Sequence, residues 1–428
     1  MQADLSLPIY QKSRKAYTVQ CTVEYFVSLL VTDTFLAKLL TNIGVEDWLV
    51  GIISSFVSLA FIFQLLSLLF SSSRISKKGT VLIFDTVSML FFMLLYLIPF
   101  LPINETFRQI LVTVSIGIAY LCKYAVSNIL FQWANGYVRA EKRASFSANK
   151  ETISLIAGIL FTLAVGAAFD FFETSGNIGA AFLLIAVLLL ILNASSFICL
   201  LMVKKDEPQT QSNPQKTFSK IMEKTFGNKN FRRLTVIAVL WDCARYFTIG
   251  FLGVFKTNDL GLTILAVQVI NTVANLCRML LSRPFGRYSD RHSFAKGFYL
   301  ALFLAAGAFL CNVFTTEALW FFIIPYTVLY TVSLAGINQN NFNITYSYVD
   351  SEYIAEAMAI KSSIGGICGF LASVVAGNLL SRIQSEGNMF FGIPMYGQQL
   401  LSLVSLILCA VCIIYMKKTI LKEKVIKQ

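Results

Sequence analysis

The chain has 428 residues, of which 56% are hydrophobic and 14% are charged, with a formal net charge of +12. A soluble domain carries about 25% charged residues, and the mean hydropathy of this chain is +0.69. The composition therefore excludes an ordinary soluble enzyme or a soluble nucleic-acid-binding module, and it indicates an integral membrane protein.

Twelve apolar runs of spanning length follow one another along the chain. A helix of about 20 apolar residues crosses a hydrocarbon core roughly 30 Å thick. Backbone groups cannot stay unpaired in that core, so each run is expected to be helical. The sequence predicts an all-α integral membrane protein with twelve transmembrane helices in two six-helix pseudo-repeats. The expected spans are 17–42, 48–70, 80–101, 107–133, 145–170, 178–203, 231–256, 262–282, 295–315, 317–345, 357–381 and 396–416.

Basic residues gather in alternate connecting segments. With the N-terminus inside, the inner segments include the basic runs 74–78 and 204–233, whereas the outer loops hold little beyond Arg108, Lys256 and Arg382. This asymmetry is the positive-inside pattern, and it predicts that both termini are cytoplasmic. The short loops favour the plasma membrane, as in a bacterial inner membrane.

One long polar interruption divides the spans into two sets of six. It is rich in Pro, Gln, Ser and Asn and is typical of a flexible linker. The predicted layout is a cytoplasmic N-terminal segment 1–16, a six-helix bundle 17–203, a cytoplasmic linker 204–230, a second six-helix bundle 231–416 and a basic cytoplasmic tail 417–428.

The two sets of spans resemble each other, which indicates an internal repeat. A shift of 217 residues places Gly44 on Gly261, and a shift of 211 places Lys150 on Lys361. A parallel repeat of this kind predicts a substrate site between the halves, near the middle of the membrane.

A basic stretch with a single aspartate separates the eighth and ninth spans. It reads Gly286-Arg287-Tyr288-Ser289-Asp290-Arg291, and a weaker copy at 71–79 contains Arg74. With this motif between the second and third spans of each half, the whole chain resembles the major facilitator superfamily. The resemblance implies a secondary transporter that works by alternating access.

The resemblance also implies a gate at the cytoplasmic helix ends. The residues assigned to it are Gly286, Arg287, Asp290, Arg291 and, in the first half, Arg74. In the family arrangement, Asp290 would face the start of the fifth span near Ala144, where unpaired N–H groups at a helix N-terminus would stabilise its carboxylate. The alternative to a gate is that the motif residues form a solvated charged turn.

The chain departs from the family pattern in two places. In the first half, Ser73 and Leu69 stand at the aspartate and glycine positions, so the first-half copy of the motif lacks the negative charge that Asp290 supplies in the second half. The fifth span also lacks the Gly-Pro-rich motif of many proton-coupled drug antiporters, which weakens a drug-efflux interpretation.

Ionisable residues within the spans are costly and point to function. Asp242 and Arg245 are three residues apart on the seventh span and share a helical face. Glu24 lies at a nearly equivalent position in the first span, so these residues are candidates for substrate or proton binding. Asp33 is half a turn out of phase with Glu24 on a straight helix, so both can face one cavity only if the helix is kinked or presents a wide face to the lumen. The alternative for Asp242 and Arg245 is an ion pair that neutralises itself.

Other polar residues in the spans complete the candidate site. Lys123 lies deep in the fourth span, and polar stripes follow the eighth and tenth spans; interhelical hydrogen bonding is the alternative for these amides. Arg278 is assigned to the gate, Lys361 to snorkelling or gating, and Asp85 to no role. The remaining candidates are Tyr25, Tyr124, Tyr246, Asn271, Asn275, Asn338 and Asn341.

The leading hypothesis is a secondary active transporter for a small polar or charged organic solute, with an organic anion or zwitterion favoured and a proton or cation as the coupling ion. The competing hypothesis is export of drugs or amphipathic cations by proton antiport. No nucleotide-binding or hydrolase motif is present, and His292 is the only histidine, so no enzyme, cofactor or metal centre is expected. The expected partners are the solute, the coupling ion and the lipid bilayer, for a protein that works as a monomer.

Overall fold

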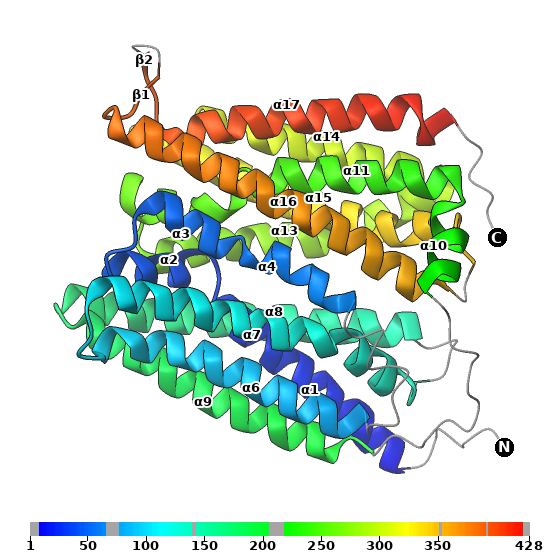
Figure 1. Cartoon of the computed structure of the whole chain (residues 1–428), viewed down its shortest axis with the longest axis horizontal. Helices are drawn as coiled ribbons and strands as arrows, with labels where there is room; N and C mark the ends of the chain where they lie inside the picture. The colour runs from blue at the N-terminus through cyan, green and yellow to red at the C-terminus, as the bar shows by residue number, and fades with distance from the viewer. Residues whose placement is uncertain are drawn as a thin grey trace. The chain divides into compact units, whose positions relative to one another are not determined.

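The computed structural model describes residues 8–65, 77–138, 143–204, 218–350, 353–390 and 393–422. The chain folds almost entirely into helices (Figure 1). The first unit of the chain contains α1 (Pro8–Leu30), α2 (Asp33–Asn42), α6 (Lys77–Leu97), η2 (Ile98–Phe100), α7 (Glu105–Asn135), α8 (Arg143–Thr174) and α9 (Ile178–Met202). The second contains α3 (Asp47–Ser54), α4 (Phe56–Leu59), η1 (Ala60–Phe63), α10 (Phe218–Phe226), α11 (Lys229–Tyr246), η4 (Ile249–Phe251), α12 (Leu252–Val254), the π-helix η5 (Phe255–Asp259), α13 (Ile264–Arg291), α14 (Phe294–Val313), η6 (Trp320–Phe322), α15 (Ile323–Tyr346), α16 (Ile354–Ser385), α17 (Gly397–Lys418) and η8 (Ile420–Lys422).

Ten helices in the described part of the chain are long and apolar enough to cross a membrane. They correspond to ten of the twelve expected spans. The first expected span is divided into α1 and α2, and the described part of the second forms the shorter run α3, α4 and η1. One short antiparallel strand pair, β1 (Met389–Phe390) and β2 (Ile393–Pro394), was not expected from the sequence.

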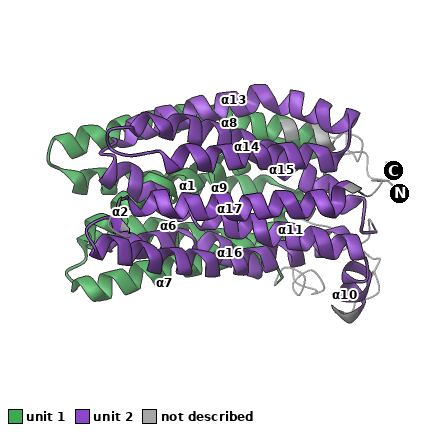
Figure 2. Ribbon diagram, turned by 90° about the horizontal axis from the view of Figure 1, so that it is seen from above, with its two compact units in different colours: residues 1–45, 63–214 green, residues 46–62, 215–428 purple. Residues whose placement is uncertain are grey.

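Two compact units divide the chain (Figure 2). One comprises residues 1–45 and 63–214, and the other comprises 46–62 and 215–428. The segment 46–62 thus groups with the second unit, although in the predicted repeat it belongs with the first six spans. Glycines explain its close packing: a Cβ atom at Gly366 would overlap the carbonyl oxygen of Ser58, and one at Gly377 would lie 3.1 Å from that of Trp48.

The backbone supports the internal repeat. Gly44 and Gly261, which the shift of 217 residues superposes, both have positive φ angles, of 80° and 61°. Left-handed backbone of this kind favours glycine, which has no Cβ to clash. Each glycine ends a helical segment before the next span begins, so both halves turn at the same point of the repeat.

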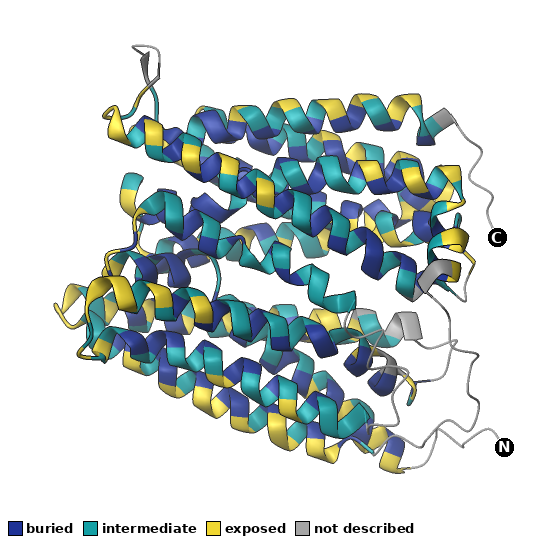
Figure 3. Cartoon of the chain, viewed as in Figure 1, coloured by how far each residue is buried: buried dark blue, intermediate teal, exposed yellow. Residues whose placement is uncertain are grey.

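Burial follows the helical faces in each unit (Figure 3). Large aromatic side chains such as Phe298, Phe309 and Tyr326 fill the core of the second unit. Leucine side chains on other helical faces are exposed, and the exposed fraction is 67% for Leu160 and 72% for Leu280. Exposed apolar faces of this length are what a protein presents to lipid tails.

Candidate functional site

The first and seventh spans are both interrupted. The α1 helix ends at Leu30 and α2 begins at Asp33, whereas α11 ends at Tyr246 and η4 begins at Ile249. With the repeat shift of 217 residues, the two interruptions overlap. Membrane transporters use such discontinuous helices to expose backbone groups to bound solutes and ions.

Asp33 occupies the interruption in the first span. Its φ angle is +50°, a left-handed value that is rare outside glycine and best tolerated by Asn and Asp. The straight helix assumed in the phase argument against Asp33 is therefore absent, and the helical phase of Glu24 does not determine where Asp33 points.

The strongest concentration of buried charge in the second unit surrounds Asp242. The Oδ1 atom of Asp242 lies 2.9 Å from the Nε atom of Arg245, as their spacing on one helical face predicts. A guanidinium nitrogen of Arg245 also donates a 3.0 Å hydrogen bond to the Tyr246 hydroxyl, and its central carbon lies 4.5 Å from the centroid of that ring. Three of the predicted site residues are thus brought together at the end of α11.

A second cation joins this cluster from α16. Lys361 is only 1% exposed, and it lies within electrostatic range of Asp242. Its Nζ donates to Asn341 Oδ1 at 2.8 Å and to Thr345 Oγ1 at 2.6 Å, both on α15. The expectation that Lys361 snorkels to the membrane surface was wrong, because its ammonium group is buried and donates to acceptors on α15 inside the unit. Gating by Lys361 remains a prediction.

Small residues on α16 make this arrangement possible. A Cβ atom at Gly365 would overlap Asp242 Oδ2, and one at Gly369 would lie 2.6 Å from the Tyr246 ring. The two glycines therefore let α16 approach Asp242 and Tyr246 on α11 closely. They belong to the charged cluster, although they carry no polar side chain.

Aromatic rings pack beside the charged cluster of α11. Trp241 stacks on Tyr330 with ring centroids 6.3 Å apart, and Tyr330 stacks on Tyr326 at 5.8 Å. All three are at most 6% exposed. The charged cluster is consequently backed by rigid aromatic packing, which keeps its geometry fixed.

The predicted residues of the first unit form a separate group. Glu24 on α1 and Lys123 on α7 both lie within electrostatic range of Asp85 on α6, and Ser196 Oγ on α9 donates a 2.8 Å hydrogen bond to Asp85 Oδ2. Tyr25 packs against Gly158, and Tyr124 pairs with the Tyr120 ring at 6.3 Å. Sequence reasoning dismissed Asp85 as lying near a span end, yet it stands eight residues inside α6, roughly 12 Å along its axis.

The polar residues of α13 and α15 do not all join the charged cluster. Asn271, Asn275 and Arg278 are partly buried along α13, and Asn338 is exposed on α15. Of the two α15 amides in the predicted site, Asn341 is the one that bonds to Lys361. The roles of the other residues remain predictions.

The basic motif lies at the end of a helix. The α13 helix continues through Pro284 to Arg291, with Arg287, Asp290 and Arg291 exposed. A Cβ atom at Gly286 would lie 3.2 Å from the Gln339 amide nitrogen, so this glycine allows α13 to meet α15. Gating by these residues remains a prediction, and Arg74 lies outside the described residues.

The motif also packs through its uncharged residues. A Cβ atom at Gly297 on α14 would overlap Ser289 Oγ and would lie 2.8 Å from Asn340 Nδ2. Ser289 is 1% exposed, and Asn340 is fully buried. Three helices therefore meet here at a position where only glycine fits.

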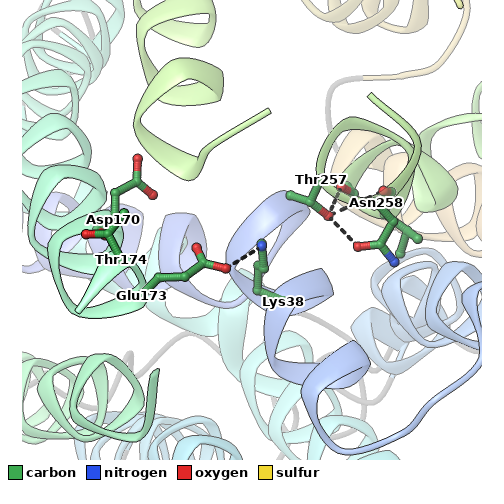
Figure 4. A network of polar contacts seen from close by, with 8 residues as sticks. Lys38, Asp170, Glu173, Thr174, Thr257 and Asn258 are labelled. Atoms are coloured by element: carbon green, nitrogen blue, oxygen red, sulfur yellow. Dashed lines mark hydrogen bonds and ion pairs between the residues drawn. The ribbon is translucent and has the colours of Figure 1, made fainter. Parts of the chain in front are cut away.

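Polar contacts also tie helix ends together at the opposite ends of the spans (Figure 4). Lys38 forms a 2.7 Å ion pair with Glu173, joining α2 to α8 within the first unit. Within the second unit, Asp47 accepts hydrogen bonds from Asn258 at 3.1 Å and Gln384 at 3.0 Å. These contacts fix α3 against η5 and α16.

Comparison with known proteins agrees with this architecture. The structure of the nucleoside transporter NupG is similar, with a TM-score of 0.69 and 13% identity, over 98% of this chain and 100% of that one. A bacterial homologue of the lysosomal transporter Spinster gives 0.68 and 13%, over 97% and 98%. A POT family peptide transporter gives 0.67 and 13%, over 98% and 97%.

At these identities the structural matches establish the fold alone. No curated protein sequence matches the chain. The family model of the Major Facilitator Superfamily, however, matches residues 53–373, which is three quarters of the sequence. Together with the helical architecture, this match means that the chain belongs to the major facilitator superfamily, as a multi-pass membrane transporter of a small-molecule substrate.

Proposed function

We propose that this secondary transporter carries a small organic anion or zwitterion, coupled to a proton or another cation. The observation that carries the proposal is the charge balance of the second-unit cluster. Two cationic groups, Arg245 and Lys361, accompany one carboxylate, Asp242. Buried charges need compensation, and a substrate anion would supply the missing negative charge.

The chemistry of the cluster suits a carboxylate-bearing solute. The planar guanidinium of Arg245 can bind a carboxylate through two parallel hydrogen bonds. Lys361 offers a compact ammonium group, already oriented by Asn341 and Thr345. If the solute also carries an ammonium group, Asp242 can accept it, and this would extend the site from anions to zwitterions.

Direct binding measurements test the proposal. Purified protein is titrated with a panel of organic anions, zwitterions and lipophilic cations while its thermal unfolding is followed. Anions or zwitterions should raise the unfolding temperature, because ligands that bind the folded state stabilise it. Lys361→Gln should weaken their affinity about 10- to 100-fold, from the roughly 1.5–3 kcal/mol that a hydrogen bond to a charged group contributes.

A matched control separates the effect of the Lys361 charge from the general effect of removing a lysine. Lys38→Gln removes a lysine that is paired with Glu173 in the first unit, well away from Asp242 in sequence, and it should leave anion affinity unchanged. Stabilisation by lipophilic cations alone, with no effect of Lys361→Gln, would instead favour drug export and would overturn the anion proposal.

A further inference from the structure

Two cysteines meet where α11 and α16 pack together in the second unit. The thiol of Cys243 on α11 donates a 3.6 Å hydrogen bond to the backbone carbonyl oxygen of Cys368 on α16. Both side chains are partly exposed, so small reagents can reach them. A thiol is a weak hydrogen-bond donor, and little stabilisation is lost when the Cys243 sulfur gives up this bond for another partner.

Glycine contacts fix how the two helices are aligned. Gly365 on α16 packs against Ala238 and Asp242 on α11, and Gly369 packs against Asp242 and Tyr246. The contacts advance in the same direction along both helices, so α11 and α16 run parallel here, side by side in Figure 1. Each glycine lies against residues 123 and 127 positions before it in the chain, and is therefore level with the position midway between them.

The two cysteines share one level and one flank of this contact. Cys243 and Cys368 are 125 residues apart, which is the separation of positions that stand level on the two helices. Cys243 follows the contact residue Asp242 by one position, and Cys368 precedes Gly369 by one, so each is turned by about 100° from the line of contact. On facing parallel helices, turns of opposite sense lead to the same side. In agreement, the two thiols lie within electrostatic range of each other.

A thiol pair of this kind is suited to a soft atom that takes two sulfur ligands. A zinc–sulfur bond is about 2.3 Å long, so a bridging atom of similar size joins two sulfur atoms up to about 4.6 Å apart. Rotation about the Cα–Cβ bonds adjusts their separation. Zinc itself does not fit, because structural zinc takes four ligands, and among the residues that the structure describes no group of three or more His, Cys, Asp or Glu could hold a metal ion.

We propose that Cys243 and Cys368 form a binding site for thiophilic compounds that take two sulfur ligands, represented by trivalent organoarsenicals. With phenylarsine oxide, two S–H bonds and the bonds between arsenic and oxygen break, and two As–S bonds form. Both protons leave with the oxygen as one water molecule, and arsenic stays trivalent. The product is neutral, so it adds no charge to the poorly solvated interior of the unit. This site goes beyond the proposed transport function and does not depend on it.

Binding of phenylarsine oxide to the purified full-length protein tests the site. The protein is treated in detergent, and intact-mass measurement counts the bound arsenicals. One arsenical should bind per chain, and two thiols should become protected from maleimide labelling. The adduct should resist a monothiol but be released by dithiothreitol, because two sulfur atoms on one chain hold arsenic as a chelate. Peptide mapping should assign the protected thiols to α11 and α16.

Serine variants separate this pair from the other cysteines. Cys243→Ser and Cys368→Ser should each weaken arsenical binding at least about 100-fold, because a single remaining thiol loses the advantage of the second, intramolecular bond. The matched control is Cys277→Ser, which removes a partly exposed thiol on α13 of the same unit. It should bind the arsenical as tightly as the parent protein does.

Several results would overturn the proposal. They are the absence of any bound arsenical, its release by a monothiol, and undiminished binding by either Cys243→Ser or Cys368→Ser. Protection of Cys409 and Cys412, the buried pair on α17, would also contradict it by placing the dithiol elsewhere. If a serine variant fails to fold, the count, release and mapping on the parent protein still decide, because they need no substitution. Failure of anion binding at Lys361 would overturn the proposed substrate class and leave the arsenical result standing.

Discussion

Substituting Gly365 by alanine should disturb the charged cluster without removing any of its polar groups. The new Cβ would overlap Asp242 Oδ2, whereas ordinary contact begins at 3.4 Å. In a close-packed interior the carboxylate must retreat by on the order of 1 Å. If the retreat lengthens the 2.9 Å pair with Arg245 by that amount, the Coulomb attraction falls by roughly 1.5 kcal/mol at an effective dielectric constant of about 20. Overpacking alone costs about 1–3 kcal/mol.

The assay is equilibrium unfolding of the purified protein in a mild detergent, compared with a second glycine variant. Gly307 lies on α14 of the same unit, and a Cβ there would be 3.8 Å from Leu329 Cδ1, an ordinary contact. Gly307→Ala should therefore stabilise the protein by about 0.5–1 kcal/mol through helix propensity, whereas Gly365→Ala should destabilise it by about 1–3 kcal/mol. The reasoning is refuted if the two variants unfold at the same denaturant concentration.

Three smaller predictions concern packing and pairing elsewhere. Lys38→Met breaks the ion pair with Glu173. Because both side chains are partly exposed, the free energy of unfolding should fall by less than about 1 kcal/mol. A larger decrease in a chemical unfolding experiment would contradict the assignment as a partly exposed pair. Gly297→Ala should destabilise the protein by about 1–3 kcal/mol. Adding Ser289→Ala should recover part of that loss, because Ser289 Oγ is the atom that the new methyl group meets. If the effects of the two substitutions are purely additive in the double variant, the contact is contradicted. Tyr330→Phe should be neutral or stabilising, because the buried Tyr330 hydroxyl has no hydrogen-bond partner among the described residues. Clear destabilisation in the same assay would mean that the hydroxyl does make a stabilising hydrogen bond.

Features that depend on local sequence could be predicted well. The Asp242–Arg245 pair follows from a spacing of three residues on one helix, and the turn at Gly44 and Gly261 follows from the repeat. Hydropathy alone located ten of the twelve expected spans among the described residues, because the length of an apolar helix is dictated by the membrane.

Features that depend on packing between distant segments could not be predicted. Lys361 was assigned to snorkelling or gating because lysines at helix ends often snorkel, and only its acceptors on α15 reveal that its ammonium group is buried. Asp85 was judged by its place in the span, whereas its buried hydrogen bond comes from Ser196 on α9. Its depth inside α6 was the one signal in the sequence that could have drawn attention to it.

The shared interruption of the first and seventh spans bears on the history of this protein. Neither break contains proline; the first reads Val31-Thr32 and the second Phe247-Thr248. The position of the break is shared, but its backbone differs, because Thr32 is extended and Asp33 is left-handed, whereas Thr248 has helical angles. The economical explanation is that a single ancestral six-helix protein already carried a break here before its gene was duplicated, and that the backbone of each copy has since diverged.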